Sequence, residues 1–349
     1  MPREIISIHV GGTGSLVGLD TVNRMCLEHG IHSDGTQLYF AARYPDGVFF
    51  NEQPSGKRFH RSMFVDLEPK IVDEIRSGSY AALFRPECLV SGMGKPAGNN
   101  FAIGKNFGND IIERLMEVSV RRLAEECDML QGFNIYNASG GGIGAGLTSL
   151  VCENLGKRFR KQSVLNFSID SNYSSPDQAV NHALGLYYMQ EDVDVSIPLG
   201  VNAMKKLCQS QLRLKKPTDA DTTRLMATVA CATTESLRFP NSQVNQDLKE
   251  FTTNLVPYRS LKFILSSYGP LVPVNTVYRA KFDPISIANS LFTNTSVVCN
   301  AVNGSVMGAT MHYRGDFRPD EVNRGRTSTR RRINFIDFVP TGFKVDYML

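Results

Sequence analysis

Two glycine-rich stretches of the sequence have the residue types needed to bind an anion. Residues 138–147 read ASGGGIGAGL, with five glycines in ten residues, and residues 11–18 read GGTGSLVG. Each stretch follows an expected strand and precedes an expected helix, where backbone N–H groups and a helix N-terminus can bind phosphate. Neither fits the GxxxxGK[ST] or the GxGxxG spacing. We expect a pair of nucleotide-binding loops, and tight turns that bind no ligand are the alternative.

Two carboxylates follow the second predicted strand. Asp66 and Glu68 lie in the segment VDLEP, which ends that strand. Paired carboxylates at such an edge can hold Mg²⁺ through water. They can equally be solvated acids at the start of a helix, because Pro69 is typical of a first helical position. The sequence leaves both interpretations open.

The spacing of apolar residues predicts the elements that position these groups. The predicted strands are IISIHV, MFVDLEP, QGFNIYN and SVLNFSI. Helical patterns cover residues 19–29, 109–130 and 219–238, with Asn109 or Asp110 as the N-cap of the second helix. Alternating strands and helices predict the α/β class, a parallel sheet flanked by helices, with a long central helix after it.

The pattern changes after residue 239 and predicts a smaller α+β domain. Strands with hairpin-like spacing are expected at 260–269, 296–304, 305–315 and 332–340. The predicted organisation is a nucleotide-binding domain, a connecting segment with the central helix, and the smaller domain, at 1–203, 204–238 and 239–349.

Composition excludes several classes of protein. The chain has 349 residues and a net charge of +4, and it has neither an apolar run of the ~20 residues that a membrane span needs nor a nucleic-acid module. Its seven cysteines are scattered, which favours a reducing compartment and argues against a metal or disulfide role. The basic run from Arg324 to Arg332 is expected on a surface, facing solvent or an anionic protein partner.

Several motifs together resemble the tubulin family, specifically its α branch. They are MPREIISIHVG, CLEHGI, FVDLEP, NLVPY, YRGD and FVPTGFKV, and they extend over essentially the whole chain. The resemblance implies a tubulin/FtsZ-like GTPase fold with GTP and Mg²⁺ as cofactors. It also implies a heterodimer with β-tubulin through longitudinal filament contacts, in the cytoplasm, as a structural constituent of microtubules.

The resemblance also implies a set of site residues. Asp66 and Glu68 match the Mg²⁺-linked acids. Asn181 stands in place of a ribose-binding glutamate, and Val201, Asp219 and Thr223 stand in place of residues that contact guanine. The expected nucleotide-binding residues are Gly11, Gly12, Thr13, Asn99, Ser139, Gly140, Gly141, Gly142, Ile143, Gly144, Asn181, Asn202 and Thr223.

Substitutions within these loops remove polar side chains. Ala138, Ile143 and Ala145 replace hydroxyl residues of the family, which leaves backbone N–H groups as donors to phosphate. Gly12 stands where the family has glutamine. Lys95 replaces an acid and is expected to place a positive charge near the phosphates.

Glu250 is the expected catalytic residue. The segment VNQDLKEF resembles the part of α-tubulin that faces the nucleotide of the next subunit, with Asn245 and Asp247 also matching. The resemblance implies that Glu250 activates water beside a partner's γ-phosphate and that the chain does not hydrolyse its own nucleotide. An exposed acid that favours a helix start is the alternative.

Two functions follow from these expectations. The first is an α-tubulin-like microtubule subunit that binds GTP. The second is a degenerate tubulin that binds nucleotide weakly or not at all and acts as a cap, a decoy or a specialised tubulin-binding protein. The family continues beyond this chain into a C-terminal helical hairpin and an acidic tail. Their absence is expected to reduce motor and MAP binding.

Overall fold

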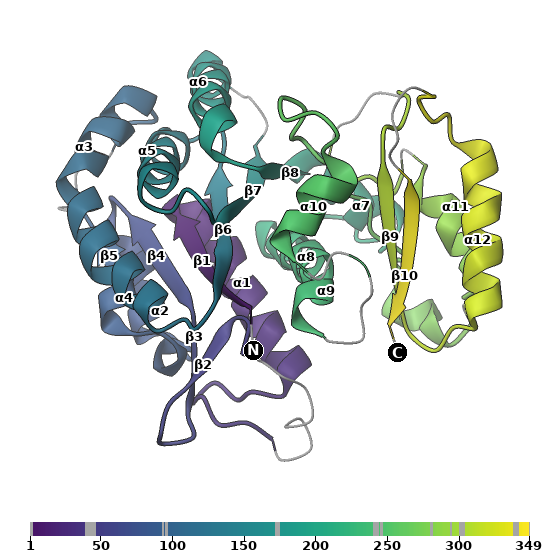
Figure 1. Ribbon diagram of the computed structural model, residues 1–349, viewed down its shortest axis with the longest axis horizontal. Coiled ribbons are helices and arrows are strands. Elements are labelled where there is room, and N and C mark those ends of the chain that lie inside the picture. Colours follow the sequence, from purple (N-terminus) through teal and green to yellow (C-terminus); the bar gives the residue numbers. More distant parts are fainter. Residues whose placement is uncertain are drawn as a thin grey trace.

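The computed structural model describes residues 3–38, 47–92, 94, 97–171, 175–239, 244, 247–279, 282–293, 295–299, 304–337 and 342–348. A six-stranded sheet with the order β5-β4-β1-β6-β7-β8 forms its centre (Figure 1). All neighbouring strands in it are parallel, which confirms the predicted α/β class. The strands are β1 (Glu4–Val10), β4 (Ser62–Asp66), β5 (Leu89–Ser91), β6 (Leu130–Ala138), β7 (Ser163–Asp170) and β8 (Val195–Gly200).

Helices cover both faces of this sheet, because its strands are apolar on both sides. In β1, Ile5 joins one core cluster while Ile6 and Ile8 join the other. On the Ile6 face lie α3 (Phe101–Arg114), α4 (Arg121–Glu125), α5 (Gly142–Arg158) and α6 (Pro176–Asp192). On the Ile5 face lie α1 (Gly11–His29), α2 (Pro69–Ser77), α7 (Val201–Ser210), α8 (Asp219–Thr233), α9 (Glu235–Arg238) and α10 (Leu248–Leu255).

The helix expected at 109–130 begins eight residues earlier, at Phe101. Its N-cap is Asn100, whose Oδ1 accepts from the N–H groups of Ala102 and Ile103, so the prediction of Asn109 or Asp110 was wrong. After α3 the helix passes through a π-helical segment, Leu115–Val120. Glycines with low helix propensity hid the first turns in the sequence. Packing requires Gly104, because a Cβ there would lie 2.3 Å from the carbonyl oxygen of Gly142.

Two further helices differ from their predicted bounds, and one hairpin was not predicted. The helix expected from residue 19 begins at Gly11, directly after β1. The central helix is interrupted at Thr234 between α8 and α9. A small antiparallel hairpin pairs β2 (Phe50–Glu52) with β3 (Arg58–His60), and two 3-10 turns lie at Ala81–Leu83 and Pro86–Cys88.

A second body follows the sheet and packs around its own core. It contains a 3-10 segment (Val274–Arg279), α11 (Pro284–Leu291), β9 (Ala309–Arg314), α12 (Pro319–Arg332) and β10 (Phe343–Met348). The strand expected at 305–315 is present as β9. The segments expected as strands at 260–269, 296–304 and 332–340 form only isolated bridges within their described residues.

The expected hairpin spacing in this body was also wrong. Strands β9 and β10 pair in parallel, and a parallel pair needs a crossover that a short turn cannot supply. Here α12 is that crossover, and the two strands lie against it and α11 (Figure 1).

Ion pairs of Arg314 join the second body to the sheet, next to a buried pair within the first body. Arg238 of α9 is 2% exposed, and its Nη2 lies 2.7 Å from Glu28 Oε2 of α1. Arg314 of β9 reaches the same region, with 3.2 Å from its Nη1 to Glu28 Oε1 and 2.9 Å from its Nε to Glu235 Oε1. Although burial alone would raise the pKa of Glu28, the two guanidinium groups lower it. No helix among the described residues is long and apolar enough to cross a membrane.

Candidate functional site

The predicted loops meet at one edge of the sheet. Gly11 follows β1, Asp66 ends β4, Ser139 follows β6 and Asp170 ends β7. These four strands are consecutive neighbours in the order β4-β1-β6-β7, and carboxyl ends of parallel strands lie at the same edge. The sequence placed the first three residues together correctly. It missed Asp170, although an acid at the end of the segment SVLNFSID is the same signal as Asp66 after MFV.

The two glycine-rich loops touch each other. Gly11 has φ 73°, and a Cβ on it would lie 3.5 Å from the backbone nitrogen of Gly144 and 3.7 Å from Ile143 Cγ2. Helices α1 and α5 begin at these loops, and their N-cap residues, Val10 and Gly141, carry no side-chain acceptor. The first N–H groups of two helices are therefore left for another partner, which is the arrangement of an anion site.

Packing explains some of the glycines in the second loop. A Cβ on Gly142 would lie 2.5 Å from the nitrogen of Asn100, and one on Gly144 would lie 2.3 Å from the carbonyl oxygen of Ala138. A Cβ on Gly146 would lie 2.4 Å from the carbonyl oxygen of Phe101. Gly141 differs, since the nearest atom to its Cβ would be 3.8 Å away. Packing against backbone atoms thus requires three of the five glycines. Gly141 has no such constraint, and a Cβ on Gly140 would lie 2.8 Å from the Ser171 hydroxyl oxygen.

The Asn181 side chain joins the loop at Asn99 to the glycine-rich loop at Gly140. It is 4% exposed, and its Nδ2 donates to the carbonyl oxygens of Asn99 at 2.8 Å and Gly140 at 3.3 Å. Its Oδ1 accepts from the N–H of Phe101 at 3.1 Å. Both amide hydrogens and the amide oxygen are therefore used inside the protein. This geometry makes Asn181 a residue that positions the Asn99 and Gly140 loops.

Ser139 is also bonded within the protein. It is 1% exposed, and its Oγ lies 2.6 Å from Asp170 Oδ1 and 3.2 Å from the carbonyl oxygen of Ile169. Since the carboxylate can only accept, the hydroxyl donates there. Contact with a phosphate at Ser139 would therefore rely on the backbone.

The acidic pair splits into one buried and one exposed carboxylate. Asp66 is 3% exposed, its Oδ1 accepts from the N–H of Glu68 at 3.1 Å, and burial raises its pKa to about 6. Glu68 is exposed and precedes α2. A Cβ on Gly12 would lie 3.9 Å from Asp66 Oδ2 and 2.8 Å from Ile71 Cδ1. The position of Gly12 is therefore bordered by the apolar Ile71 side chain and by the buried carboxylate of Asp66.

The expected base-binding residues lie at the starts of α7 and α8. Asn202 and Thr223 are both half-buried there, and the Thr223 hydroxyl donates to the carbonyl oxygen of Ala220 at 3.0 Å. Asp219 is paired with Lys205 of α7, with 3.0 Å from Nζ to Oδ1. The sequence analysis missed Lys205, because nothing in the local pattern shows which residue of α7 faces the start of α8.

Glu250 lies on α10, away from the loops. The preceding Asp247 accepts from Gln131 Nε2 at 2.8 Å and from Arg3. Gln131 stands at the amino end of β6, so the start of α10 lies roughly 23 Å along that strand from the loop after Ala138, at ~3.3 Å per residue. Lys95 and Asn245 lie outside the described residues. No group of three metal-ligating side chains occurs in the described ranges.

A parallel α/β sheet with two glycine-rich loops at its carboxyl edge defines a nucleotide-binding type of protein. Comparison with known families gives a narrower assignment. Residues 4–209 match the GTPase domain of the Tubulin/FtsZ family, and residues 260–348 match the tubulin C-terminal domain. The chain is 40% identical to the tubulin alpha-2 chain of Eleusine indica, over 98% of this chain and 78% of that relative.

The chain therefore belongs to the tubulin family. Within it, the match to an α chain over nearly the full length makes it an α-tubulin-like cytoskeletal subunit. These findings confirm the resemblance, the fold and the expectation of an α-tubulin-like cytoskeletal subunit.

Proposed function

We propose that this subunit binds GTP at the two glycine-rich loops, pairs with a β-tubulin and enters microtubules in the cytoplasm. The observation that carries the proposal is the contact between the Gly11 and Gly144 loops at the uncapped starts of α1 and α5. Two helix N-termini beside each other favour a polyphosphate, because both supply N–H donors and partial positive charge. The match to the tubulin GTPase domain supports guanine nucleotide as the ligand.

The residues present fit a phosphate group through the backbone. The cradle has too little space for a side chain on Gly142 or Gly144, and Asn181 holds the neighbouring Asn99 and Gly140 loops together. We propose that Asn99 and Thr13, both exposed at this edge, complete the contacts. Mg²⁺ would be held by Asp66 and Glu68 through water, and it would neutralise charge on the phosphates.

Glu250 is proposed to act on a different nucleotide. Its position at the opposite end of β6 from the loops means that it cannot reach the phosphate site of its own chain. A longitudinal neighbour could bring a nucleotide to it, and the carboxylate would then orient and deprotonate water. Its own nucleotide would remain unhydrolysed in the heterodimer.

Three contacts favour the second candidate function, a tubulin with weak nucleotide binding that acts as a cap or decoy. The Asn181 amide is fully hydrogen-bonded inside the protein. The Asp219 carboxylate is paired with Lys205, and the Ile71 side chain borders the position of Gly12. Each contact replaces a polar group that the family offers to the nucleotide. Missing base contacts cost roughly 1–3 kcal/mol each, which lowers affinity by orders of magnitude.

The content of bound nucleotide separates the two candidates. The chain would be purified alone and after co-expression with a β-tubulin, then denatured, and the released nucleotide would be quantified by chromatography. The first function is supported if about one guanine nucleotide is released per chain, in addition to the nucleotide that the β-tubulin itself releases. A chain without nucleotide that circular dichroism shows to be folded supports the second.

A further inference from the structure

Asp170 stands at the carboxyl end of β7, between two groups of expected nucleotide-binding residues. Strand β7 lies between β6 and β8 in the sheet (Figure 1). In the register, Ile169 is paired with Ala138, just before the glycine-rich loop. Asp170 is paired with Gly200, just before α7. The loop proposed to bind phosphate therefore lies on one side of Asp170, and the start of α7 lies on the other.

This position corresponds to the sugar of a bound nucleotide. Neighbouring strands are ~4.8 Å apart, so the loop after β6 and the start of α7 after β8 are separated by roughly 10 Å. A nucleotide connects its phosphates to its base through the ribose. With the phosphates at the glycine-rich loop and the base at Asn202, the ribose would lie beside Asp170. This placement rests on the proposed function, from which it takes the phosphate site.

Two side chains hold the carboxylate of Asp170 in place. Ser139 Oγ donates to Asp170 Oδ1 at 2.6 Å, and Ser139 is buried. His182 of α6 contacts the same oxygen, with 3.5 Å between its Nδ1 and Asp170 Oδ1. The side chain of Asp170 is nevertheless 29% exposed. A carboxylate that is fixed in place and reachable from solvent is well suited to accept hydrogen bonds from a ligand.

The charge of Asp170 determines which part of a ligand it can contact. A carboxylate only accepts hydrogen bonds, and it repels phosphate. The two hydroxyls of a ribose are neighbours and can each donate one hydrogen bond to it. In dinucleotide-binding folds, an acidic residue binds the ribose in this way. Hydrogen bonds to a charged acceptor are stronger than those between neutral groups, so such a contact contributes to affinity.

The residue expected at the ribose from the family resemblance is already occupied. Asn181 precedes His182 on α6, and its amide hydrogens and oxygen are bonded to Asn99, Gly140 and Phe101. Asp170 therefore provides an acceptor at the position of the sugar that Asn181 does not provide.

A magnesium ion is the competing ligand for this carboxylate. Asp66, the expected Mg²⁺ ligand, ends β4, which is three strand spacings or roughly 14 Å from β7. The two acids therefore cannot share one ion. A Mg²⁺ at Asp170 would strengthen binding of every nucleotide alike, whereas a contact with the sugar would distinguish nucleotides by their hydroxyls.

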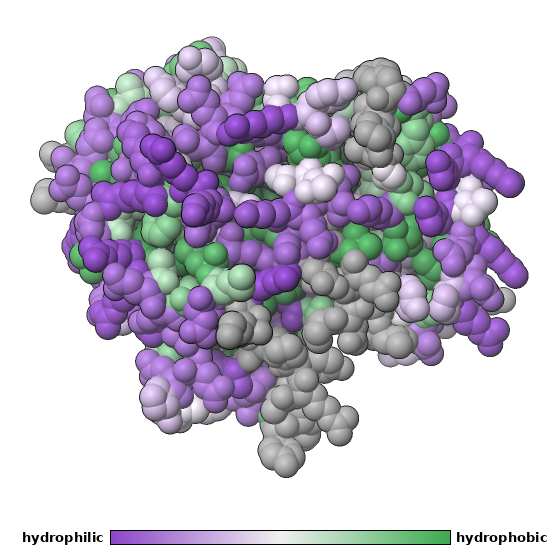
Figure 2. Space-filling view, in the orientation of Figure 1, coloured by the Kyte–Doolittle hydropathy of each residue, from purple (hydrophilic) through white to green (hydrophobic). Residues whose placement is uncertain are grey.

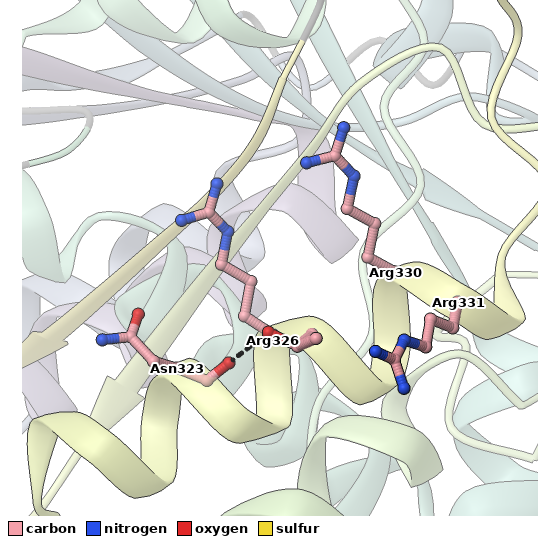
Figure 3. Close-up of a pocket in the computed structure, with 5 residues that line it drawn as sticks. Asn323, Arg326, Arg330 and Arg331 are labelled. Carbon is pink, nitrogen blue, oxygen red and sulfur yellow. Dashed lines mark hydrogen bonds between the residues drawn. The ribbon is translucent and has the colours of Figure 1, made fainter.

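The basic cluster of the second body takes no part in this site. Helix α12 carries a pocket lined by Asn323, Arg326, Thr327, Arg330 and Arg331, and Figure 3 shows Arg326 and Arg330 extending to the same side of the helix. The surface there is strongly hydrophilic (Figure 2). Helix α12 packs on α11 and β10 at the far edge of the molecule (Figure 1), apart from the carboxyl end of β7.

We propose that Asp170 binds the ribose hydroxyls of the nucleotide and makes the site selective for ribonucleotides over nucleotides that lack these hydroxyls. Ser139 and His182 are positioning residues that hold the carboxylate, and Asp170 is the residue in contact with the sugar. Hydrogen bonds to a charged group correspond to a preference of about ten- to hundredfold.

Isothermal titration calorimetry of the full chain, freed of nucleotide, tests the proposal with GTP and 2′,3′-dideoxy-GTP in the presence of Mg²⁺. The parent chain is expected to bind GTP about ten- to hundredfold more tightly than the dideoxy analogue. Asp170→Asn should lower this ratio to about threefold or less, because a neutral amide oxygen is a weaker acceptor. Ser139→Ala should give an intermediate ratio, since the carboxylate would lose one of the groups that hold it.

The matched control is Asp110→Asn, which removes the same charge from an exposed position on α3 and should keep the ratio of the parent chain. Circular dichroism would verify that the variants fold. Equal affinity of the parent chain for the two nucleotides would overturn the assignment of Asp170 and leave GTP binding intact.

An unchanged ratio in Asp170→Asn, with lower affinity for both nucleotides, would also overturn it. Asp170 would then support the Ser139 loop or bind Mg²⁺. Binding of neither nucleotide by the folded parent chain would overturn the proposed function together with the assignment of Asp170.

Discussion

Single residues at the loops combine a packing role with a proposed binding role. Gly144 packs against the carbonyl oxygen of Ala138, and Gly11 of the other loop packs against the backbone of Gly144. The same absence of side chains that lets α5 pack closely also exposes backbone N–H groups. A substitution at Gly144 would therefore change stability and ligand binding together.

The variant Gly144→Ala is expected to lower the free energy of unfolding by about 1–3 kcal/mol, because its Cβ would lie 2.3 Å from the carbonyl oxygen of Ala138. Bound nucleotide should fall as well. Urea unfolding measures the first effect, and chromatography measures the second. Gly342→Ala is the matched control, since a Cβ there would have no atom within 4 Å. Equal stability of the two variants would show that the backbone at Ala138 moves to accommodate the new methyl group at little cost.

Buried histidines should make the protein sensitive to mild acid. Burial lowers the pKa of His9 and of His29 to about 3, below the value of ~6.5 in an unfolded chain. The unfolded state therefore binds more protons below pH 6.5, and stability falls as the pH falls. Between pH 7.5 and 6.0 each histidine should cost about 0.8 kcal/mol.

Urea unfolding at the two pH values tests this expectation. Asp66 acts in the opposite direction, because burial raises its pKa to about 6, whereas His60, whose pKa burial also lowers, adds to the loss. Replacing His9 by leucine should reduce the pH dependence, and replacing the exposed His32 by glutamine should leave it unchanged. A stability that stays constant over this range would refute the assignment.

At the scale of elements, the ends of helices are determined by caps and by close packing. The central helix α8 begins with a capping box, in which Thr218 Oγ1 accepts from the N–H of Asp221 and Asp221 Oδ2 accepts from the N–H of Thr218. This box starts the helix next to the Asp219–Lys205 pair. The geometry of the proposed base pocket therefore depends on it.

Thr218→Ala is expected to destabilise the protein by ~1 kcal/mol, the usual cost of losing an N-cap side chain. Thermal unfolding followed by circular dichroism would measure the change. Thr253→Ala in α10, at an exposed position, should stay within about 0.5 kcal/mol of the parent chain. If the two variants behaved alike, the cap would not limit the stability of α8.

At the scale of the whole molecule, Arg314 of the second body forms ion pairs with Glu28 and Glu235 of the sheet body. Arg238 and Arg314 approach the same carboxylate from α9 and β9. Breaking a buried pair leaves one charge without compensation, which is more costly than losing a surface pair.

Arg238→Met should therefore cost about 3–5 kcal/mol, because Glu28 would stay buried without its closest partner. Arg76→Met is the matched control, since Arg76 and Asp73 are about half exposed, and it should cost less than about 1 kcal/mol. Urea unfolding and limited proteolysis would compare them. A cost for Arg238→Met within the range of the control would show that Arg314 and Arg24 compensate the charge of Glu28 without Arg238.

The sequence by itself determined the features that local patterns encode. Apolar periodicity predicted the parallel sheet, glycine spacing predicted the two loops, and strand ends placed Gly11, Asp66 and Ser139 at one edge. The motifs predicted the tubulin family. These features depend on neighbours within a few residues, or on the rule that parallel strands end at a common edge.

Only the tertiary structure decided which side chains meet. Asn181 contacts the Asn99 and Gly140 loops, Asp219 pairs with Lys205, and α3 begins at Asn100. It also showed that Arg238 is buried and paired with Glu28 of α1. Each contact joins segments that lie far apart in the sequence or depends on close packing between helices. No local periodicity specifies such a pairing, because the energy of the contact exists only once both segments are packed.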